Sequence, residues 1–190
     1  MKTTGRFVKG RVLLATAAAL AVSLALFIPR VFAAGNRATA TLVSTTGAEV
    51  GTVKLNEVGP NGTVEVRVSV HGLIAGFHGF HIHTIGACTP DFGAAGTHFN
   101  PGGGSHPSHA GDQPAVLVNA DGTGSMTFVT DRYKIADLFD PDGSAFIVHE
   151  KADNYANIPT DRYDPDPDSI TLGTGDAGTR IACGVIGAGG

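Results

Sequence analysis

The sequence predicts an all-β fold, an eight-stranded Greek-key barrel or sandwich that carries two long functional loops. Short segments of alternating apolar and polar residues recur along the chain, and the clearest, TVEVRVSV at residues 63–70, places four valines on one face. Glycine and proline contribute 27 and 10 of the 190 residues, and several of them stand between these segments, where turns need them. Roughly eight short strands joined by turns are typical of sandwiches and barrels.

The expected strands begin after the first 36 residues. They cover residues 37–45, 49–55, 63–70, 77–84, 115–119, 125–130, 145–149 and 180–186. The fifth and sixth of these flank the turn residues Ala120-Asp121-Gly122 and are expected to form a hairpin. Only residues 133–139 favour a short helix. The connections 86–114 and 150–179 are long for a compact domain, and loops of this length are usually functional or disordered.

The first 33 residues have the pattern of a secretory signal peptide. Four basic residues precede an uncharged apolar run over residues 12–28, and residues 31–33 resemble a small-residue cleavage site. We expect cleavage after Ala33 and a mature domain of residues 34–190, secreted or held in the cell envelope. The alternative is an uncleaved membrane anchor, since 17 apolar residues lie at the short limit for a membrane span.

Loss of the N-terminal segment changes the charge of the protein. It removes five of the 13 basic residues and none of the 17 acidic ones, so the formal net charge falls from −4 to −9 with histidines neutral. A chain this acidic argues against nucleic-acid binding and against docking to an anionic membrane. Membrane contact is therefore expected only if the N-terminal segment stays attached.

Histidines concentrate in residues 78–112, which hold six of the eight in the chain. His81 and His83 are two apart on an expected strand, so they share one face, while Phe80 and Ile82 share the other. Two imidazoles side by side on a rigid strand can hold one metal ion, and imidazole suits zinc, copper, iron and nickel. His78 has the parity of Phe80 and is expected on the core side rather than as a ligand.

Two metal sites can be assembled from these histidines and residues near them. Cu(II) favours a tetragonal set of nitrogen ligands, and the candidates are His81, His83, His98 and His149. A second, tetrahedral set is typical of structural zinc when no ligand position is left open, and it would consist of His98, His106, His109 and Asp112. His98 would then serve both metals, one through each ring nitrogen. The alternative for the second set is a solvated Gly/Ser/Pro loop that happens to hold histidines.

Three further features have simpler interpretations. His71, near the end of an earlier strand, is expected to face solvent. Four aspartates alternate with prolines over residues 161–168, and we expect a stiff, solvated acidic loop there, with a calcium site as the alternative. The two cysteines, Cys88 and Cys183, suggest a disulfide because a secreted chain with an even number of cysteines usually pairs them. Free thiols are the alternative.

Five segments together resemble the copper/zinc superoxide dismutases, and the resemblance spans essentially the whole mature chain. The segments are GFHGFHIH (76–83), THFNP (97–101), HAGD (109–112), VHEKADN (148–154) and TGDAGTRIACGVIG (174–187). The resemblance implies a Greek-key barrel, an antioxidant oxidoreductase that acts on superoxide, and copper and zinc as cofactors. NYANIP and DRY, further along the chain, are similar to segments of secreted bacterial members.

The resemblance also assigns roles to individual residues. It makes His81, His83, His98 and His149 copper ligands, and His98, His106, His109 and Asp112 zinc ligands. Asp153 matches the carboxylate that links ligands of the two metals. His98 as the bridge and Arg180 as the cation that attracts superoxide match the catalytic residues. Cys88 and Cys183 match the family disulfide.

The sequence departs from the common family pattern in two places. Only two residues separate His106 from His109, and the 150–179 loop is long and acidic. The short spacing puts zinc binding in question, although HAGD keeps the family spacing. The leading hypothesis is an extracytoplasmic superoxide dismutase in which copper cycles between two oxidation states and zinc is structural. The alternative is a non-catalytic module that binds copper or zinc outside the cell.

Overall fold

The computed structural model describes Met1 and residues 35–159, 161 and 164–190. The chain divides into two units after Val31, and the fold described below belongs to the second, Phe32–Gly190. The signal peptide expected over residues 1–33 lies outside the described residues, apart from Met1. No helix within the described ranges is long and apolar enough to cross a membrane.

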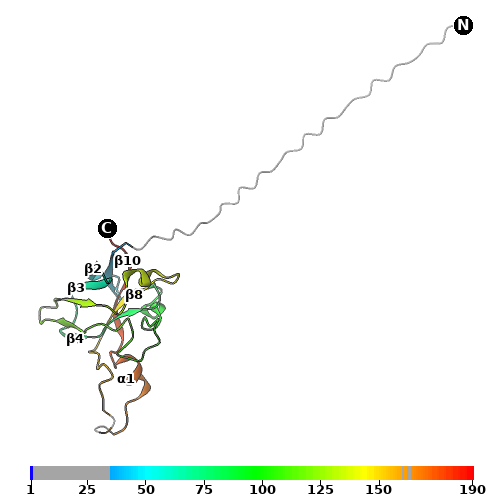
Figure 1. Ribbon diagram of the computed structural model, residues 1–190. Helices are drawn as coiled ribbons and strands as arrows, with labels where there is room; N and C mark the ends of the chain where they lie inside the picture. The colour runs from blue at the N-terminus through cyan, green and yellow to red at the C-terminus, as the bar shows by residue number, and fades with distance from the viewer. Residues whose placement is uncertain (2–34, 160, 162–163) are drawn as a thin grey trace. The chain divides into compact units, whose positions relative to one another are not determined.

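The described part of the second unit is built mainly from strands (Figure 1). They are β1 (Arg37–Ser44), β2 (Glu49–Val58), β3 (Thr63–Val70), β4 (Gly76–His78), β5 (Phe80–His83), β6 (Val116–Val118), β7 (Gly124–Thr130), β8 (Ala145–His149), β9 (Arg180–Val185) and β10 (Gly187–Ala188). The helices are short: the 3₁₀ turns η1 (Phe92–Ala95) and η2 (Ile135–Phe139) and the α-helix α1 (Ser169–Thr174).

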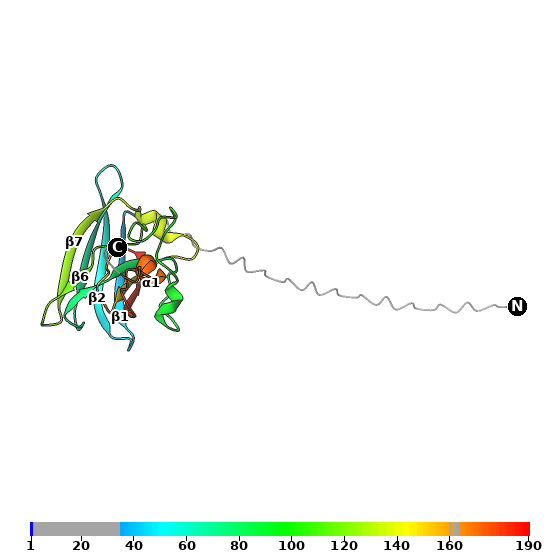
Figure 2. The same ribbon diagram turned by 90° about the horizontal axis from the view of Figure 1, so that it is seen from below.

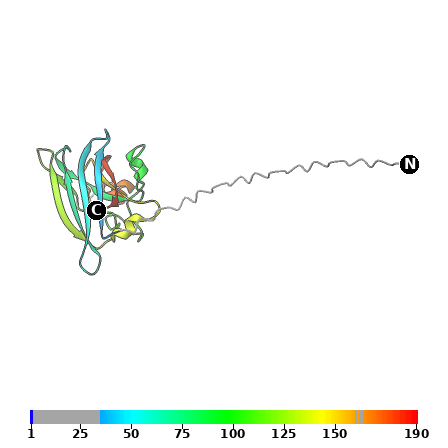
Figure 3. The same cartoon turned by 90° about the horizontal axis from the view of Figure 1, so that it is seen from above.

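The strands form an antiparallel sheet that curls on itself, so the all-β prediction is confirmed. Neighbours run in the order β5-β8-β9-β1-β2-β3-β7, β10 pairs with β1, and β4 and β6 make a separate two-stranded sheet. Figures 2 and 3 show the long strands β1, β2 and β7 on one side of the unit, with the helices and long loops on the other. The site lies on the loop side.

Alternation along the strands builds the core. On β3 the residues Val64, Val66, Val68 and Val70 are all buried, as the TVEVRVSV pattern predicts. Phe80 of β5 stacks on Phe146 of β8 with ring centroids 5.0 Å apart, and both are fully buried. Aromatic side chains of this size contribute most of the hydrophobic stabilisation of a small core.

The strands β5 and β8 are buried on both faces, and one of these faces carries the site. One face contributes Phe80 and Ile82 of β5 to the main core. On the other face, His81 lies opposite Ile147 and His83 lies opposite Ala145, and directly opposed residues of an antiparallel pair point to the same side. The histidines therefore stand on the outer surface of the sheet, and the long loops cover them.

Three sequence predictions need correction. The strand expected over 77–84 breaks into β4 and β5 at Gly79, where an added Cβ would lie 2.7 Å from the Cβ of Ala177, because the 150–179 loop packs tightly there. The strands β6 and β7 flank a turn but do not pair, since β6 bonds to β4 and β7 to β3. The loop 150–179 contains α1, whose amino end is capped by the Asp168 carboxylate.

A disulfide joins Cys88 to Cys183, 95 positions apart in sequence. Cys183 is fully buried on β9 in a small outer cluster with Ile147 and Ala95. The bond attaches the loop that follows β5 to the sheet beneath the histidines. It therefore fixes one border of the site.

Candidate metal centre

The strand β5 fixes the first pair of candidate ligands, and two other segments bring the rest. His81 and His83 are 0% and 1% exposed. His98 forms an isolated β-bridge with His83, which places the loop residue against the strand. His149 ends the neighbouring strand β8. The four histidines offer ligand atoms that lie within 4.8 Å of one another.

In three of these rings, one nitrogen is hydrogen-bonded and the other has no hydrogen-bond partner in the described part of the chain. The ring of His83 donates from Nδ1 to the Gly96 carbonyl (2.9 Å), and His149 donates from Nδ1 to the Gly178 carbonyl (3.0 Å). The Nε2 atom of His81 lies 2.7 Å from Asp153 Oδ2. Carbonyl and carboxylate oxygens accept, so these nitrogens carry the protons, and the opposite nitrogens present lone pairs.

The unpaired ring nitrogens are the main evidence for a metal site. The Nδ1 atom of His81 and the Nε2 atoms of His83 and His149 are buried and have no hydrogen-bond partner among the described residues. Unpaired buried polar atoms are rare and cost free energy, so a group of them within 4.8 Å of one another is typical of a ligand site. Fixing one imidazole nitrogen by an oxygen acceptor is also how metal-ligating histidines are usually oriented.

A second cluster stands beside the first and shares His98. Ligand atoms of His98, His106, His109 and Asp112 lie within 4.8 Å of one another. The Nδ1 atoms of His98, His106 and His109 lie 2.8, 3.2 and 3.2 Å from oxygens of the Asp112 carboxylate. Three imidazoles and one carboxylate match the donor set of a four-coordinate zinc site. His98 turns Nδ1 to this cluster, which leaves its Nε2 for the first.

Asp153 connects the two clusters. Its Oδ2 atom is bonded to His81, its Oδ1 atom lies 2.9 Å from Nε2 of His106, and Oδ1 also accepts the backbone N–H of Tyr155 at 2.7 Å. Behind the carboxylate lies Gly175, the left-handed C-cap of α1 with φ of +66°, where an added Cβ would collide with Asp153. The helix in the acidic loop therefore fixes the carboxylate between the metal clusters.

The electrostatics differ between the two clusters. Burial lowers the pKa of His83 to about 2 and that of His149 to about 3, and it also lowers the pKa of His81. These rings are neutral at ordinary pH, which is the form that binds metal. Burial alone would lower the pKa of His106, but the Asp112 carboxylate, 3.2 Å from Nδ1, and the Asp153 carboxylate, hydrogen-bonded to Nε2, raise that pKa to about 9.

Arg180 stands at the entrance to the first cluster. A register irregularity after Val148 places Arg180 opposite His149, and such bulges commonly re-aim a side chain near a site. The guanidinium donates to the carbonyls of Phe92 (2.5 Å) and Gly96 (2.6 Å). It lines a cavity of about 330 Å³ together with His83, His98 and His149. The cation therefore lies where an anion would approach these histidines.

The structure brings together every candidate ligand from the sequence, with Asp153 and Arg180. It also shows supporting residues that the sequence did not suggest, namely the carbonyls of Gly96 and Gly178 and the helix cap at Gly175. His78 is buried, as expected, and its ring lies 2.7 Å from the carbonyl of His149 and 2.8 Å from that of Ile74. His71 is exposed, as expected.

Sequence comparisons give the chain relatives with a named activity. The sequence profile described as copper/zinc superoxide dismutase (SODC) matches residues 49–186. A superoxide dismutase (Cu-Zn) of Mycolicibacterium paratuberculosis is 40% identical over 160 residues, which is 75% of this chain and 70% of the relative. The Mycobacterium tuberculosis protein of the same name is 40% identical over 168 residues, 80% of this chain and 70% of the relative.

Solved structures share the fold and carry more varied names. A SOD-like protein from Bacillus subtilis is 34% identical with a TM-score of 0.62, covering 80% of this chain and 99% of its own. A double mutant of that SOD-like protein, in which a tyrosine and a proline are replaced by histidine, is also similar, at 34% identity and TM-score 0.62 over 77% and 95%. The clock protein EA4 is 30% identical with a TM-score of 0.67, over 82% of this chain and 96% of its own.

Proposed function

The chain belongs to the copper/zinc superoxide dismutase family, and from that premise we propose that it converts superoxide to oxygen and hydrogen peroxide outside the cytoplasm. Copper would be held by His81, His83, His98 and His149, and zinc by His98, His106, His109 and Asp112. The observation that supports this most directly is the group of buried, unpaired ring nitrogens on His81, His83 and His149.

The donor sets fit these two metals. The first cluster offers only imidazole nitrogens, and the second offers three imidazoles and a carboxylate. Imidazole nitrogen suits copper, and the mixed set suits zinc. Bound copper supplies one-electron redox chemistry, by which one superoxide is oxidised to oxygen and a second, with two protons, is reduced to hydrogen peroxide.

The residues of the chain attract the substrate, orient the metal ligands and deliver a proton. The guanidinium of Arg180 attracts the anion into the cavity beside His83 and His149. The Nε2 atom of His98 would take up a proton whenever it is not bound to copper and would deliver it toward the reduced substrate, while Nδ1 stays with the zinc cluster beside Asp112. The Asp153 carboxylate keeps His81 and His106 in fixed orientations. His98, His106, His109 and Asp112 would hold zinc, which would supply a structural link for the 106–112 segment and no redox chemistry.

A non-catalytic metal-binding module is the rival function. The name of the clock protein EA4 indicates that this fold occurs in proteins known for something other than dismutation. The loss of a copper ligand or of the arginine would favour the rival. This chain has all four histidines and Arg180, and its guanidinium lines the same cavity as three of the histidines.

The test is a metal analysis and a superoxide-dismutation assay on residues 34–190. We expect one copper and one zinc per chain and activity that depends on copper. Asp112→Ala should lose zinc, keep copper on His81, His83 and His149, and retain some activity at neutral pH. Copper at full occupancy without dismutation would favour the rival function. Copper binding without any zinc, even in excess zinc, would show that the shortened loop has given up the second metal.

Export is the second part of the proposal. The apolar N-terminal segment, the mature charge of −9 and the disulfide are consistent with a protein that works in an oxidising compartment. Amino-terminal sequencing of the mature protein should begin at Ala34. Retention of the full segment in the membrane fraction would instead support the anchor.

A further inference from the structure

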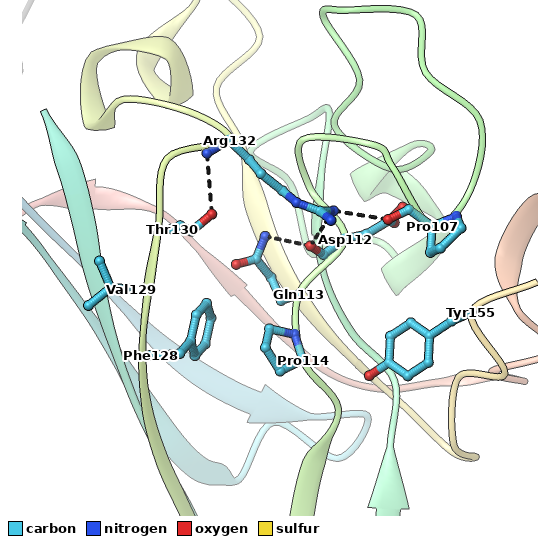
Figure 4. Close-up of a pocket in the computed structure, with 9 residues that line it drawn as sticks. All are labelled: Pro107, Asp112, Gln113, Pro114, Phe128, Val129, Thr130, Arg132 and Tyr155. Carbon is cyan, nitrogen blue, oxygen red and sulfur yellow. Dashed lines mark hydrogen bonds between the residues drawn. The ribbon is translucent and has the colours of Figure 1, made fainter. Parts of the chain in front are cut away.

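Arg132 follows β7 and reaches across to the segment that carries the zinc-cluster ligands. Its Nη1 atom donates to the carbonyls of Pro107 at 2.9 Å and Asp112 at 3.3 Å (Figure 4), and to that of His109 at 3.2 Å. These carbonyls belong to two of the candidate ligands and to the residue that follows a third, His106. One cationic group thus contacts the backbone of the whole 106–112 turn.

The two ends of this turn are anchored differently. At the Asp112 end, Gly111 donates to the Phe99 carbonyl at 2.7 Å and accepts from Ile82 of β5 at 2.9 Å. Around His106 and His109 the backbone bonds are local, such as Ser108 to Ser105 at 2.6 Å. Among the described residues, Arg132 is the donor that joins the Pro107 carbonyl to the body of the sheet.

The opposite border of the segment is held by a different side chain. Tyr155 accepts the backbone N–H of Ala115 at its hydroxyl oxygen, at 2.7 Å. A cavity of about 460 Å³ is lined by both Tyr155 and Arg132, together with Asp112 (Figure 4). Arg180 lines a different cavity, in which Arg132 has no part, so Arg132 contacts the segment outside the cavity that the substrate would enter.

An arginine is suited to this position. All three contacts come from Nη1, which belongs to a rigid, planar and always charged guanidinium, whereas the three donors of a lysine ammonium sit on a flexible stem. Hydrogen bonds from a charged donor are stronger than neutral ones. The short spacing between His106 and His109 leaves a tight turn with few residues to stabilise it, so an external donor to its carbonyls has a large share in setting its shape.

We propose that Arg132 is a positioning residue for zinc, which holds the 106–112 turn in the conformation that directs His106, His109 and Asp112 to one point. The inference rests on the proposed function, because it assumes that this cluster binds zinc. It makes Arg132 responsible for affinity at a metal that it does not touch.

The test compares Arg132→Ala with Arg132→Lys and with a control, Arg67→Ala. Arg67 is also an exposed arginine, on β3, and bonds Glu65 at 2.8 Å rather than the zinc segment. The zinc dissociation constant is measured by chelator competition on the full mature protein. Outer-shell partners of a metal site change affinity by about 10- to 100-fold. We expect roughly a tenfold weakening in Arg132→Ala, since its guanidinium is partly exposed, and a smaller loss in Arg132→Lys.

Cobalt in place of zinc gives a readout that a general loss of stability would not change. The visible absorption of cobalt reports the symmetry of its ligands, so Arg132→Ala should alter the bands while Arg67→Ala leaves them unchanged. Copper affinity should stay within twofold of the parent in all three variants. Circular dichroism and thermal unfolding of the metal-free proteins establish that each variant is folded.

Equal zinc affinity in the parent and in Arg132→Ala would overturn the inference and leave the dismutase proposal intact. Equal weakening in Arg132→Ala and Arg67→Ala would also overturn it, since the cause would then be a general change of charge. A parent that takes up no zinc would overturn it together with the zinc part of the proposed function. A parent that binds zinc more tightly than Arg132→Ala but shows no copper-dependent dismutation would support the role of Arg132 and refute the activity.

Discussion

Replacing His149 tests the first metal cluster separately from the second, because the ring of His149 belongs to the first cluster alone. His149→Ala should abolish copper binding and dismutation, while zinc content and the fold stay close to those of the parent. Copper content and activity after reloading check this, with His71→Ala as a control on an exposed histidine. A His149→Ala protein that recovers most of its activity would refute the assignment to copper.

Charge, rather than size, is the property of Arg180 that should matter for rate. Local electrostatic steering changes association rates by about 10- to 10³-fold. Arg180→Glu should therefore slow the reaction far more than Arg180→Lys, with copper content unchanged and with a difference that shrinks as salt is added. Lysine cannot reproduce both hydrogen bonds to the Phe92 and Gly96 carbonyls, so some loss is expected there too. Parent-like rates in both variants at low salt would remove Arg180 from the mechanism.

The raised pKa of His106 predicts how metal-free protein responds to pH. A group whose pKa is raised on folding contributes stability that is complete below its unfolded pKa of about 6.5. That contribution is lost as the pH rises through about 9, the pKa that Asp112 and Asp153 impose on His106. The melting temperature of the metal-free protein should fall between pH 6.5 and 9.

A matched variant makes that pH experiment specific. His106→Gln removes the titrating ring, so its melting temperature should change less over the same interval. A metal-free parent whose stability was flat from pH 6 to 9 would contradict the ion pair between His106 and the two carboxylates.

Among the elements, α1 provides the sharpest comparison, because Gly173 within it and Gly175 at its C-cap have opposite requirements. At Gly175, φ is +66° and an added Cβ would collide with Asp153, whereas at Gly173 an added Cβ meets nothing within 4 Å. Gly175→Ala should destabilise the protein by at least about 1 kcal/mol from backbone strain alone and weaken zinc binding by displacing Asp153. Gly173→Ala should be neutral or slightly stabilising, since alanine favours a helix by up to about 1 kcal/mol.

Thermal unfolding and zinc titration of Gly175→Ala and Gly173→Ala test these two expectations. If Gly175→Ala melted and bound zinc like Gly173→Ala, α1 would not be holding Asp153.

The sequence predicted the features of the strands that depend on local periodicity, and it missed those that depend on tertiary contacts. The alternation in TVEVRVSV and in FHIH was enough to assign the buried face of β3 and the histidine face of β5. Strict alternation would put Arg180 on the core side with Ala182, and the register irregularity after Val148 changes this. Its place beside His149 was expected only from family resemblance.

The wrongly predicted hairpin shows this dependence on tertiary contacts, whereas the missed helix had local signals. Residues 115–119 and 125–130 look like a hairpin locally, but β7 pairs with β3 in the large sheet and β6 pairs with β4 in the small one. Residues 169–174 lie in an acidic, proline-rich stretch that suggests a loop. The helix signals were present, since Asp168 is a good N-cap and Gly175 a good C-cap.

For the whole molecule, the disulfide is the long-range link. A cross-link that closes roughly 100 residues stabilises the folded state by about 4–5 kcal/mol in the chain-entropy model. Reduction of Cys88–Cys183 should lower the melting temperature markedly and loosen the Phe92–Gly96 carbonyls that hold Arg180. Activity should fall with copper still bound. Two alkylatable thiols in the freshly isolated protein would show that the pair does not form.

The position of β9 in the sheet has a consequence for biosynthesis. β9 lies between β8 and β1 in the sheet. During synthesis β1 is made first among the described strands, and the edge that it shares with β9 stays uncovered until β2 to β8 and then β9 have been made. Until then β1 and β8 present open edges, which are sites for pairing with other chains. A nascent chain is therefore most prone to aggregate before residues 180–185 appear, and Arg180, the first residue of that strand, reaches its place opposite His149 only then.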